Sequence, residues 1–200
     1  MAEAQAQPIF FYDFYSPYSY LAAERVNSVM PVVPEWQPIS FGHILKMSER
    51  VPWSFERDDD WHARWHEIRA RAAARGLPEP RVPEGWPVES YSLVGARAAT
   101  FAKQSGRAVA YSLALFRQIF AGGRTLDEDT ALIAGAACEL HPNALKKGVE
   151  ARTVKDALSR ATQEAFELGV RGIPTVAVDG DLFWGDDRLE EAAQAVGARG

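Results

Sequence analysis

Two serines bracket a Pro-Tyr step in the segment Ser16-Pro17-Tyr18-Ser19, which follows an apolar run and opens a helical pattern. Ser16 suits the N-cap of a helix, and Pro17 suits the first helical position, which needs no backbone donor. A helix N-terminus presents unpaired N–H groups and a partial positive charge, and a serine hydroxyl adds one donor. This place can stabilise a thiolate, although capping alone would also explain the serine.

The chain has one cysteine among its 200 residues, Cys138. A single cysteine excludes an intramolecular disulfide, a CxxC redox pair and a cysteine-rich metal site. Cys138 lies in a helical segment of small residues, and we interpret it as a buried apolar side chain. Sulfur chemistry at Ser16 therefore requires a thiol that a ligand supplies.

Composition limits the class of protein and its partners. Hydrophobic residues make up 47% of the chain and charged residues 24%, which is typical of a globular protein with one core. The net charge of −5 argues against a broad phosphate-binding surface, so nucleic acid is not an expected partner. Residues 1–8 lack the features of a targeting peptide, and no apolar window approaches the roughly 18 residues of a membrane span. We expect a soluble, cytoplasmic protein with no membrane partner.

The elements that must position Ser16 begin as β-α-β. The apolar run Ile9 to Phe14 predicts a strand buried on both faces. A helix is predicted from Pro17 to about Val29, and a second strand from Trp36 to Phe41. From His43 onward no strand signal appears for about a hundred residues, and the pattern is helical.

The later part of the chain predicts α-β-β-α. Thr125 to Glu128 has capping-box form and starts a helix in the middle of the chain. Another helix is predicted from near Thr153 to Gly169, which favours a C-terminal stop. Asp179-Gly180 is a type I′ turn signal between two short apolar runs and predicts a hairpin, after which a last helix runs to about Val196.

Three motifs then indicate a family. FYDFYSPYSY at residues 11–20, GVRGIP at 169–174 and FWGDDRL at 183–189 resemble the 2-hydroxychromene-2-carboxylate isomerases and the kappa-class glutathione transferases. The element order resembles the DsbA type of thioredoxin fold. The resemblance implies an α/β protein in which a βαβ–αββα core, residues 7–42 and 152–197, is interrupted by an all-helical insertion at 43–151.

The resemblance also implies site residues. The serine that matches Ser16 holds the sulfur of glutathione in these families, and Pro174 matches the cis-proline of the superfamily. Ile173 would hydrogen-bond the cysteinyl part of the ligand. Asp186 and Asp187 match the loop that holds the γ-glutamyl group, where Asp187 could pair with the ammonium; helix N-capping is the alternative for both.

The sequence departs from the family pattern at some of these positions. Asp186 stands where the families place Gln, Ser or Asn, and its carboxylate would face the carboxylate of the ligand. The families usually have an Asn and then a Lys after the second strand, but this chain has Ser48-Glu-Arg50 and the acidic run 58–60, with Asp59 at its centre. The nearby cations are therefore Lys46 and Arg50. We assign Lys46 to binding of the ligand. The expected cofactor is therefore glutathione or another low-molecular-weight thiol.

The inserted region carries many aromatic and basic side chains. We interpret the aromatic residues Trp53, Phe55, Trp61, Trp65 and Trp86 as packing between the insertion and the sheet, with an aromatic substrate pocket as the alternative. Tyr18, Trp53 and Trp184 are assigned to the substrate pocket. A basic set is interpreted as a solvated face, of which one member could meet a carboxylate substrate: Arg64, Arg69, Arg71 and Arg75.

His62 and His66 have the i, i+4 spacing of a zinc-binding helix. Position 63 is alanine, whereas the H-E-x-x-H motif requires glutamate, and no third ligand stands out. We expect no metal, and interpret the helix as solvated or substrate-lining.

The resemblance implies a glutathione-dependent isomerase that acts on a small aromatic or electrophilic substrate and forms a homodimer. A kappa-type glutathione transferase is the nearest alternative. A thioredoxin-fold binding module without catalysis and a DsbA-like oxidoreductase homologue are further alternatives, the last disfavoured by the missing CxxC.

Overall fold

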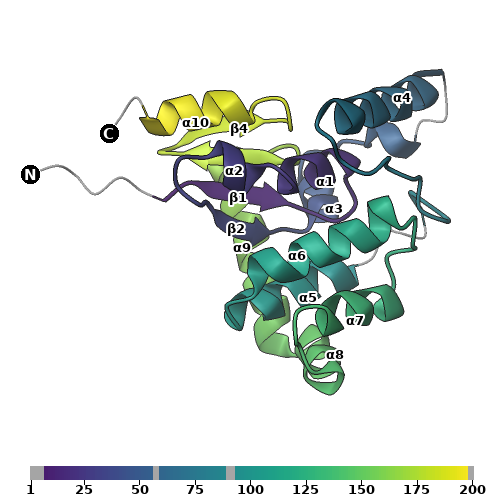
Figure 1. Cartoon of the computed structure of the whole chain (residues 1–200). Coiled ribbons are helices and arrows are strands. Elements are labelled where there is room, and N and C mark those ends of the chain that lie inside the picture. Colours follow the sequence, from purple (N-terminus) through teal and green to yellow (C-terminus); the bar gives the residue numbers. More distant parts are fainter. Residues whose placement is uncertain (1–6, 56–58, 89–92, 198–200) are drawn as a thin grey trace, which may run out of the picture.

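A four-stranded sheet with the order β2-β1-β3-β4 lies at the centre of the upper part of the molecule (Figure 1). The computed structural model describes residues 7–55, 59–88 and 93–197. β1 pairs in parallel with β2 and antiparallel with β3, and β3 pairs antiparallel with β4. The strands are β1 Ile9–Tyr12, β2 Glu35–Pro38, β3 Thr175–Val178 and β4 Asp181–Trp184.

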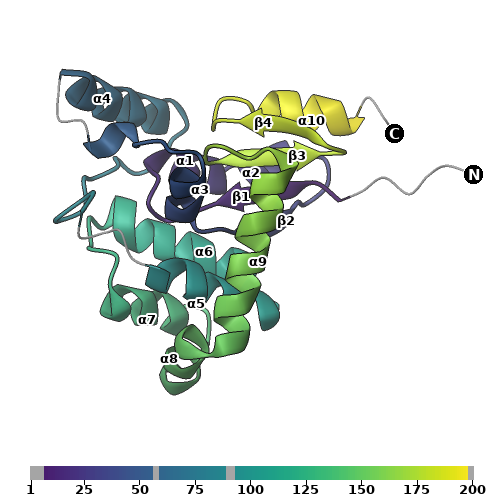
Figure 2. The ribbon, with the colours of Figure 1, turned by 180° about the vertical axis from the view of Figure 1, so that it is seen from behind.

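Helices surround this sheet and form a separate lower layer (Figures 1 and 2). α5 to α8 make up the lower layer, α4 lies beyond α1, and α9 runs from the lower layer up to the sheet. None of the helices, within the residues described, has the length and apolarity to cross a membrane. The helical elements are α1 Pro17–Ala23, α2 Val26–Val29, α3 Phe41–Met47, η1 Trp53–Phe55, α4 Asp59–Ala74, α5 Leu93–Gln104, α6 Ala108–Phe116, η2 Arg117–Ala121, α7 Glu128–Ala136, α8 Pro142–Glu150, α9 Arg152–Leu168 and α10 Leu189–Gly197.

This architecture confirms the predicted fold class, an α/β thioredoxin fold of the DsbA type interrupted by helices. The hairpin is confirmed as well, because Asp179 and Gly180 adopt φ values of 49° and 90°, the left-handed pair that a type I′ turn requires. Gly169 ends α9 with φ 105°, as predicted.

Several predicted boundaries are wrong. β1 ends at Tyr12, two residues early, and the single helix predicted to Val29 is divided because Arg25 leaves helical geometry with φ −120°. β2 ends at Pro38, after which the N–H of Ile39 still donates to the Tyr12 carbonyl at 3.0 Å. Ser40 then forms the N-cap of α3, so Phe41 begins a helix instead of ending a strand.

The predicted capping box at Thr125 is also displaced. α7 begins at Glu128, and the N-cap is Asp127, whose carboxylate accepts the N–H of Thr130 at 2.8 Å. The Thr125 hydroxyl instead donates to the carbonyl of Glu84 at 3.2 Å, which joins the start of α7 to the connection between α4 and α5.

One aromatic core joins the sheet to the helical layer. Phe10, Tyr12 and Phe14 are fully buried on one face of β1 and its extension. The rings of Phe14 and Phe116 lie 4.6 Å apart, so α6 packs directly against this face. Within this apolar contact the Tyr12 hydroxyl and Ser112 Oγ are 2.6 Å apart, and both residues are inaccessible to solvent.

A smaller apolar cluster lies on the other face of the sheet, where α3 and α9 pack. Phe11 of β1 contributes to it together with Ile39, Ile44, Ala165 and Ile173. Because this cluster includes Ile173, the packing of α9 helps to position the loop before β3.

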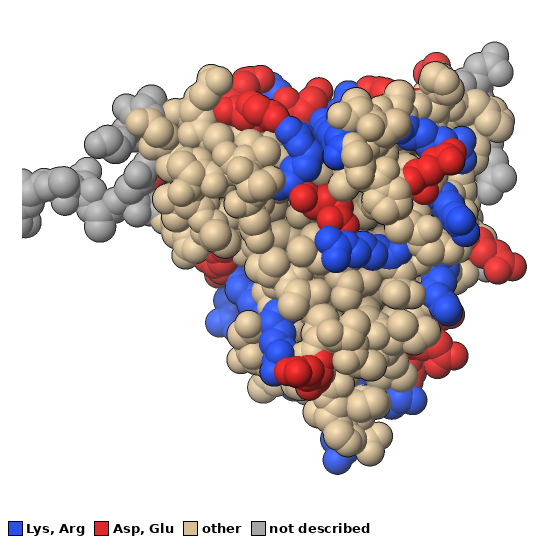
Figure 3. Space-filling view, in the orientation of Figure 1, with Lys and Arg blue, Asp and Glu red and all other residues tan. Residues whose placement is uncertain are grey.

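The surface carries charges of both signs. On the face seen in Figure 3, Lys and Arg side chains lie next to Asp and Glu side chains, and neither sign forms an extended patch there. This arrangement gives no continuous phosphate-binding surface on that face.

We expect Ser112→Ala to lower the free energy of unfolding by about 1–3 kcal/mol, because it leaves the buried Tyr12 hydroxyl without its partner. Urea denaturation measures this change. The control is Ser105→Ala, since the exposed Ser105 hydroxyl bonds only the carbonyl of Phe101, and we expect a change within about 0.5 kcal/mol. Equal effects of the two substitutions would contradict the role of the Tyr12–Ser112 hydrogen bond.

Candidate functional site

A cavity of about 510 Å³ lies at the N-terminus of α1. Its walls come from α3, α4, the loop before β3 and the loop between β4 and α10. Most of the residues predicted from the sequence line it: Ser16, Tyr18, Trp53, Ile173, Pro174, Trp184, Asp186 and Asp187. The sequence thus identifies segments that are far apart in the chain and meet at one cavity.

Lys46 is the exception among the predicted residues, because it is exposed and lies outside the lining of this cavity. Phe41 and Leu45 are the α3 residues that line it, and position 46 is turned about 100° from Leu45 around the helix. Arg50 is the neighbouring cation that lines the cavity. Asp58 and the side chain of Asp59 lie outside the described residues.

Ser16 is the N-cap of α1. Its φ and ψ of −98° and 120° are extended, and its side-chain oxygen accepts the N–H of Ser19 at 3.2 Å. Pro17 occupies the first helical position, as predicted. Because the Ser16 oxygen acts as an acceptor in the cap, the hydroxyl hydrogen is available for donation to a group in the cavity.

Ile173 and Pro174 form another part of the cavity lining, and the peptide bond between them is cis. The segment is fixed on both sides, since Thr175 Oγ1 donates to the Gly172 carbonyl at 2.8 Å and the Gly185 N–H donates to the Pro174 carbonyl at 2.9 Å. No main-chain hydrogen bond joins Ile173 to the rest of the described chain. Its N–H and C=O can therefore pair with a bound peptide-like group.

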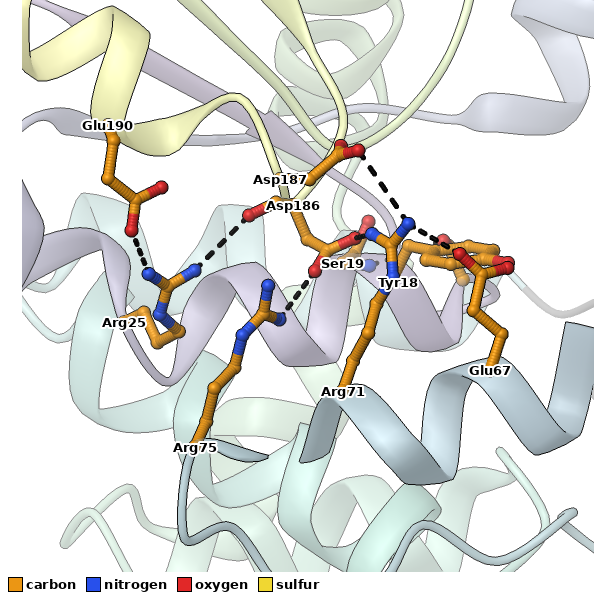
Figure 4. Close-up of polar contacts among 10 residues, drawn as sticks. Tyr18, Ser19, Arg25, Glu67, Arg71, Arg75, Asp186, Asp187 and Glu190 are labelled. Atoms are coloured by element: carbon orange, nitrogen blue, oxygen red, sulfur yellow. Dashed lines mark hydrogen bonds and ion pairs between the residues drawn. The ribbon is translucent and has the colours of Figure 1, made fainter. Parts of the chain in front are cut away.

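Asp186 is buried and held by two arginines (Figure 4). Its side chain is 1% exposed, and its carboxylate lies 2.6 Å from Arg71 on α4 and 2.5 Å from Arg75, the residue directly after the end of α4. Arg25 donates to the main-chain oxygen of Asp186 at 3.3 Å and pairs with Glu190. This cluster joins α4 to the loop between β4 and α10.

These ion pairs correct two predictions about charge. Arg71 and Arg75 do not belong to a solvated face, because they are directed at one buried carboxylate. Asp186 does not present an uncompensated charge to a ligand, because two guanidinium groups neutralise it. The i, i+4 spacing of the two arginines is the sequence signal that they share a helix face, but it does not identify their partner.

Arg71 is shared among three carboxylates. Besides Asp186 it contacts Glu67 at 2.5 Å and Asp187 at 3.6 Å. Glu67 and Asp187 are exposed, with side chains 46% and 58% accessible. One guanidinium therefore faces two exposed carboxylates here, which favours a cationic group of a ligand at this corner.

Arginines and aromatic rings are paired around the cavity. The guanidinium of Arg64 lies 5.3 Å from the Trp53 ring centroid, and that of Arg50 lies 5.8 Å from the Trp184 ring. Arg50 also donates to the carbonyl of Arg171 at 3.0 Å. None of the arginines 50, 64 and 171 forms an ion pair within the described chain, so they are the cations available to a ligand carboxylate.

The aromatic residues of the insertion serve both interpretations given above. Trp65 and Trp86 are buried in the core, with 1% and 2% exposure. Trp86 and Trp53 also line the cavity, with ring centroids 5.7 Å apart. The Tyr15 ring stacks on Trp86, and the Tyr15 hydroxyl forms a hydrogen bond with Ser54. These contacts hold the aromatic side of the cavity in place.

Asp13 is a buried carboxylate three residues before Ser16, and the sequence analysis did not single it out. It accepts the N–H of Phe41 at 2.8 Å and thereby fixes the start of α3. Burial raises the pKa of Asp13 to about 6, although N–H groups of Phe41, Phe14 and Tyr15 act in the opposite direction.

Comparisons with known proteins agree with this geometry. Residues 9–197 match the family model of the DSBA-like thioredoxin domain, and the chain belongs to this family. A curated 2-hydroxychromene-2-carboxylate isomerase from Sphingobium xenophagum is 26% identical over 194 residues, which cover 90% of this chain and 93% of that protein.

Solved structures show the same fold. A structure of 2-hydroxychromene-2-carboxylate isomerase matches with a TM-score of 0.84 at 19% identity, covering 96% of this chain and 95% of that one. A probable DsbA oxidoreductase from Streptomyces coelicolor matches with a TM-score of 0.73 at 18% identity, covering 98% and 92%. These similarities establish the DsbA-like fold over most of the chain.

Asp186→Asn should lower the free energy of unfolding by about 1–3 kcal/mol, because Arg71 and Arg75 lose the charge that they surround while keeping partial access to water. Hydrogen exchange should rise in α4 more than in α9. Asp187→Asn is the matched control, since that side chain is exposed, and we expect less than about 0.5 kcal/mol. Unchanged exchange in α4 of Asp186→Asn would contradict the docking role.

Asp13 should make stability fall as pH rises from about 4 to 6. Because the folded-state pKa of about 6 exceeds the unfolded value of 3.8, the folded protein binds more protons in this window, and charging the buried carboxylate costs about 3 kcal/mol above it. Denaturant unfolding at several pH values should show this decrease in the wild type but not in Asp13→Asn. Asp156→Asn, at an exposed position, should retain it, and parallel profiles of wild type and Asp13→Asn would refute the assignment.

Proposed function

We propose that the protein is an enzyme of the 2-hydroxychromene-2-carboxylate isomerase type that uses glutathione, or another low-molecular-weight thiol, held at Ser16. The observation that carries this proposal is the convergence of the Ser16 hydroxyl with the unpaired main chain of Ile173 on one cavity. The named isomerase relative supports it.

The residues of the cavity fit a peptide-like thiol. Ser16 can donate its hydroxyl hydrogen to a thiolate while the first N–H groups of α1 add a partial positive charge. The N–H and C=O of Ile173 can pair with the cysteinyl unit of the ligand as an added strand would. The sulfur and the backbone of the thiol thus have complementary groups in the same cavity.

The charged ends of such a ligand also find partners. Asp187 and Glu67, which share Arg71, can accept an ammonium group. Arg50 and the neighbouring Arg171 can bind a carboxylate, since neither is engaged by an acidic side chain of the described chain. Asp186 is a positioning residue in this proposal, because it acts through Arg71 and does not bind the ligand itself.

When bound, the thiol supplies a sulfur nucleophile that adds to a conjugated double bond and leaves again after rotation, so it is regenerated. Ser16 holds the negative charge of the sulfur before addition and after release. Trp53 and Tyr18 provide apolar surface for an aromatic substrate, and Arg64 above Trp53 offers a cation for an acidic group. The aromatic wall excludes water from part of this surface.

A kappa-type glutathione transferase remains the alternative within the same site, because it would use the same thiolate. The two reactions differ in the fate of the thiol, which is consumed in conjugation and recycled in isomerisation. Assays with a chloronitrobenzene acceptor and with a chromene carboxylate, run on one preparation with limiting thiol, distinguish them.

We expect Ser16→Ala to lower thiol-dependent turnover about 10- to 100-fold, because the thiolate loses a charge-assisted hydrogen bond. Steady-state assays of isomerisation with varied thiol measure this effect. Ser28→Ala is the matched control, since its exposed hydroxyl bonds only the carbonyl of Arg25.

Ser16→Asp separates the chemical role from the capping role. Aspartate caps a helix as well as serine does, so stability should be retained, but its carboxylate should repel a thiolate and reduce turnover at least as much as alanine does. Wild-type turnover in both Ser16 variants would refute the proposed function.

A further inference from the structure

A second cavity, of about 250 Å³, is lined by residues of α3, α5 and α9. Figure 2 labels these three helices. It shares no lining residue with the cavity at Ser16. Each of the three helices contributes residues one turn apart, including His43 and Met47 from α3 and Leu93 and Arg97 from α5. It is therefore a separate site that the proposed function does not use.

A fixed polar pair lies at one wall of this cavity. Ser40 Oγ and His43 Nδ1 are 2.7 Å apart, and the N–H of Ser40 donates to Thr162 Oγ1 at 3.0 Å. Ser40 and Thr162 are buried, at 4% and 3% exposure, so the position of Ser40 is well determined. When the Ser40 hydroxyl donates to Nδ1, the Nε2–H of His43 is left as a hydrogen-bond donor.

Two cations from different helices add to this donor. Arg97 of α5 and Lys155 of α9 both line the cavity. They share one carboxylate, that of Glu150, at 3.9 Å and 2.6 Å. Glu150 is 68% exposed and does not line the cavity, so the pair already binds a carboxylate that solvent can replace.

We propose that this cavity binds a small organic carboxylate whose body is about one ring in size. Arg97, Lys155 and His43 provide the donors for the carboxylate, and Met47 and Leu158 provide apolar surface for the body. The volume is below the roughly 300 Å³ at which pockets for drug-sized ligands begin, and a dry cavity of about 150 Å³ already admits benzene.

Helix α3 lies between this site and the cavity at Ser16. Phe41 and Leu45 on one side of this seven-residue helix line the Ser16 cavity, while His43 and Met47 on the other side line the second cavity. A ligand between α3 and α9 therefore contacts the helix that forms a wall of the candidate active site.

Methionine methyl resonances test the proposal directly. The chain has three methionines, of which Met47 lines the second cavity and Met30 is buried elsewhere in the core. With methyl-labelled methionine, benzoate should shift the Met47 signal in a saturable way and leave Met30 unchanged, whereas neutral benzamide should cause no such shift. Met47→Leu assigns the signal.

Variants of the charged residues give effects of opposite sign. Lys155→Gln and Arg97→Gln should each weaken benzoate binding about two- to fivefold, because each removes one cation. Glu150→Gln should strengthen it by a similar factor, because it removes the internal competitor.

The result is independent of the thiol proposal. Ser16→Ala and Arg50→Gln alter only the first cavity, so the Met47 titration should be unchanged in both. Absence of a Met47 shift, an equal response to benzamide, or wild-type affinity in Lys155→Gln and Arg97→Gln would overturn the proposed carboxylate site.

Discussion

The wall of the candidate site that α4 forms depends on one buried charge. Asp186 is 1% exposed, and a carboxylate removed from water persists only where cations and donors replace its hydration. Arg71, in the last turn of α4, and Arg75, directly after the helix, supply these charges and donors. Because the two arginines must reach the same carboxylate, α4 is held against the loop between β4 and α10. The same docking brings Arg64 and the exposed Glu67 to the cavity.

This arrangement separates the charges that hold the fold from those that are available to a ligand. The guanidinium groups that surround Asp186 are committed to a structural contact. Arg50 and Arg171 form no ion pair within the described chain. Asp187 lies 3.6 Å from Arg71, which makes shorter contacts with Glu67 and Asp186. A zwitterionic ligand can therefore bind groups of both signs without breaking the ion pairs that surround Asp186. These available charges are consistent with the proposed thiol ligand.

The sequence predicts those features that rest on local signals. The turn at Asp179-Gly180, the stop at Gly169 and the cap at Ser16 each follow from the conformational preference of one or two residues. The pairing of Asp186 with Arg71 could not be predicted in this way, because the two residues are 115 positions apart. Periodicity indicates only that Arg71 and Arg75 point in the same direction. Lys46 lies outside the cavity lining for a related reason, since the sequence indicates only the neighbourhood of this cation and a difference of one position turns a helical side chain by about 100°.

The serines at the head of α1 explain how a DsbA-like fold can retain a site without its cysteines. The helix N-terminus and the unpaired main chain at Ile173 both come from the backbone, so they persist whatever side chains stand at positions 16 and 19. Serine at position 16 keeps a donor for an anion but cannot form a mixed disulfide. Serine at position 19 also lacks the sulfur that thiol–disulfide exchange requires. Its hydroxyl is fully buried and has no hydrogen-bond partner in the described chain. What the backbone provides is a helix N-terminus and an unpaired main-chain segment on one cavity, and under the proposed function the chemistry depends on the molecule that brings the sulfur.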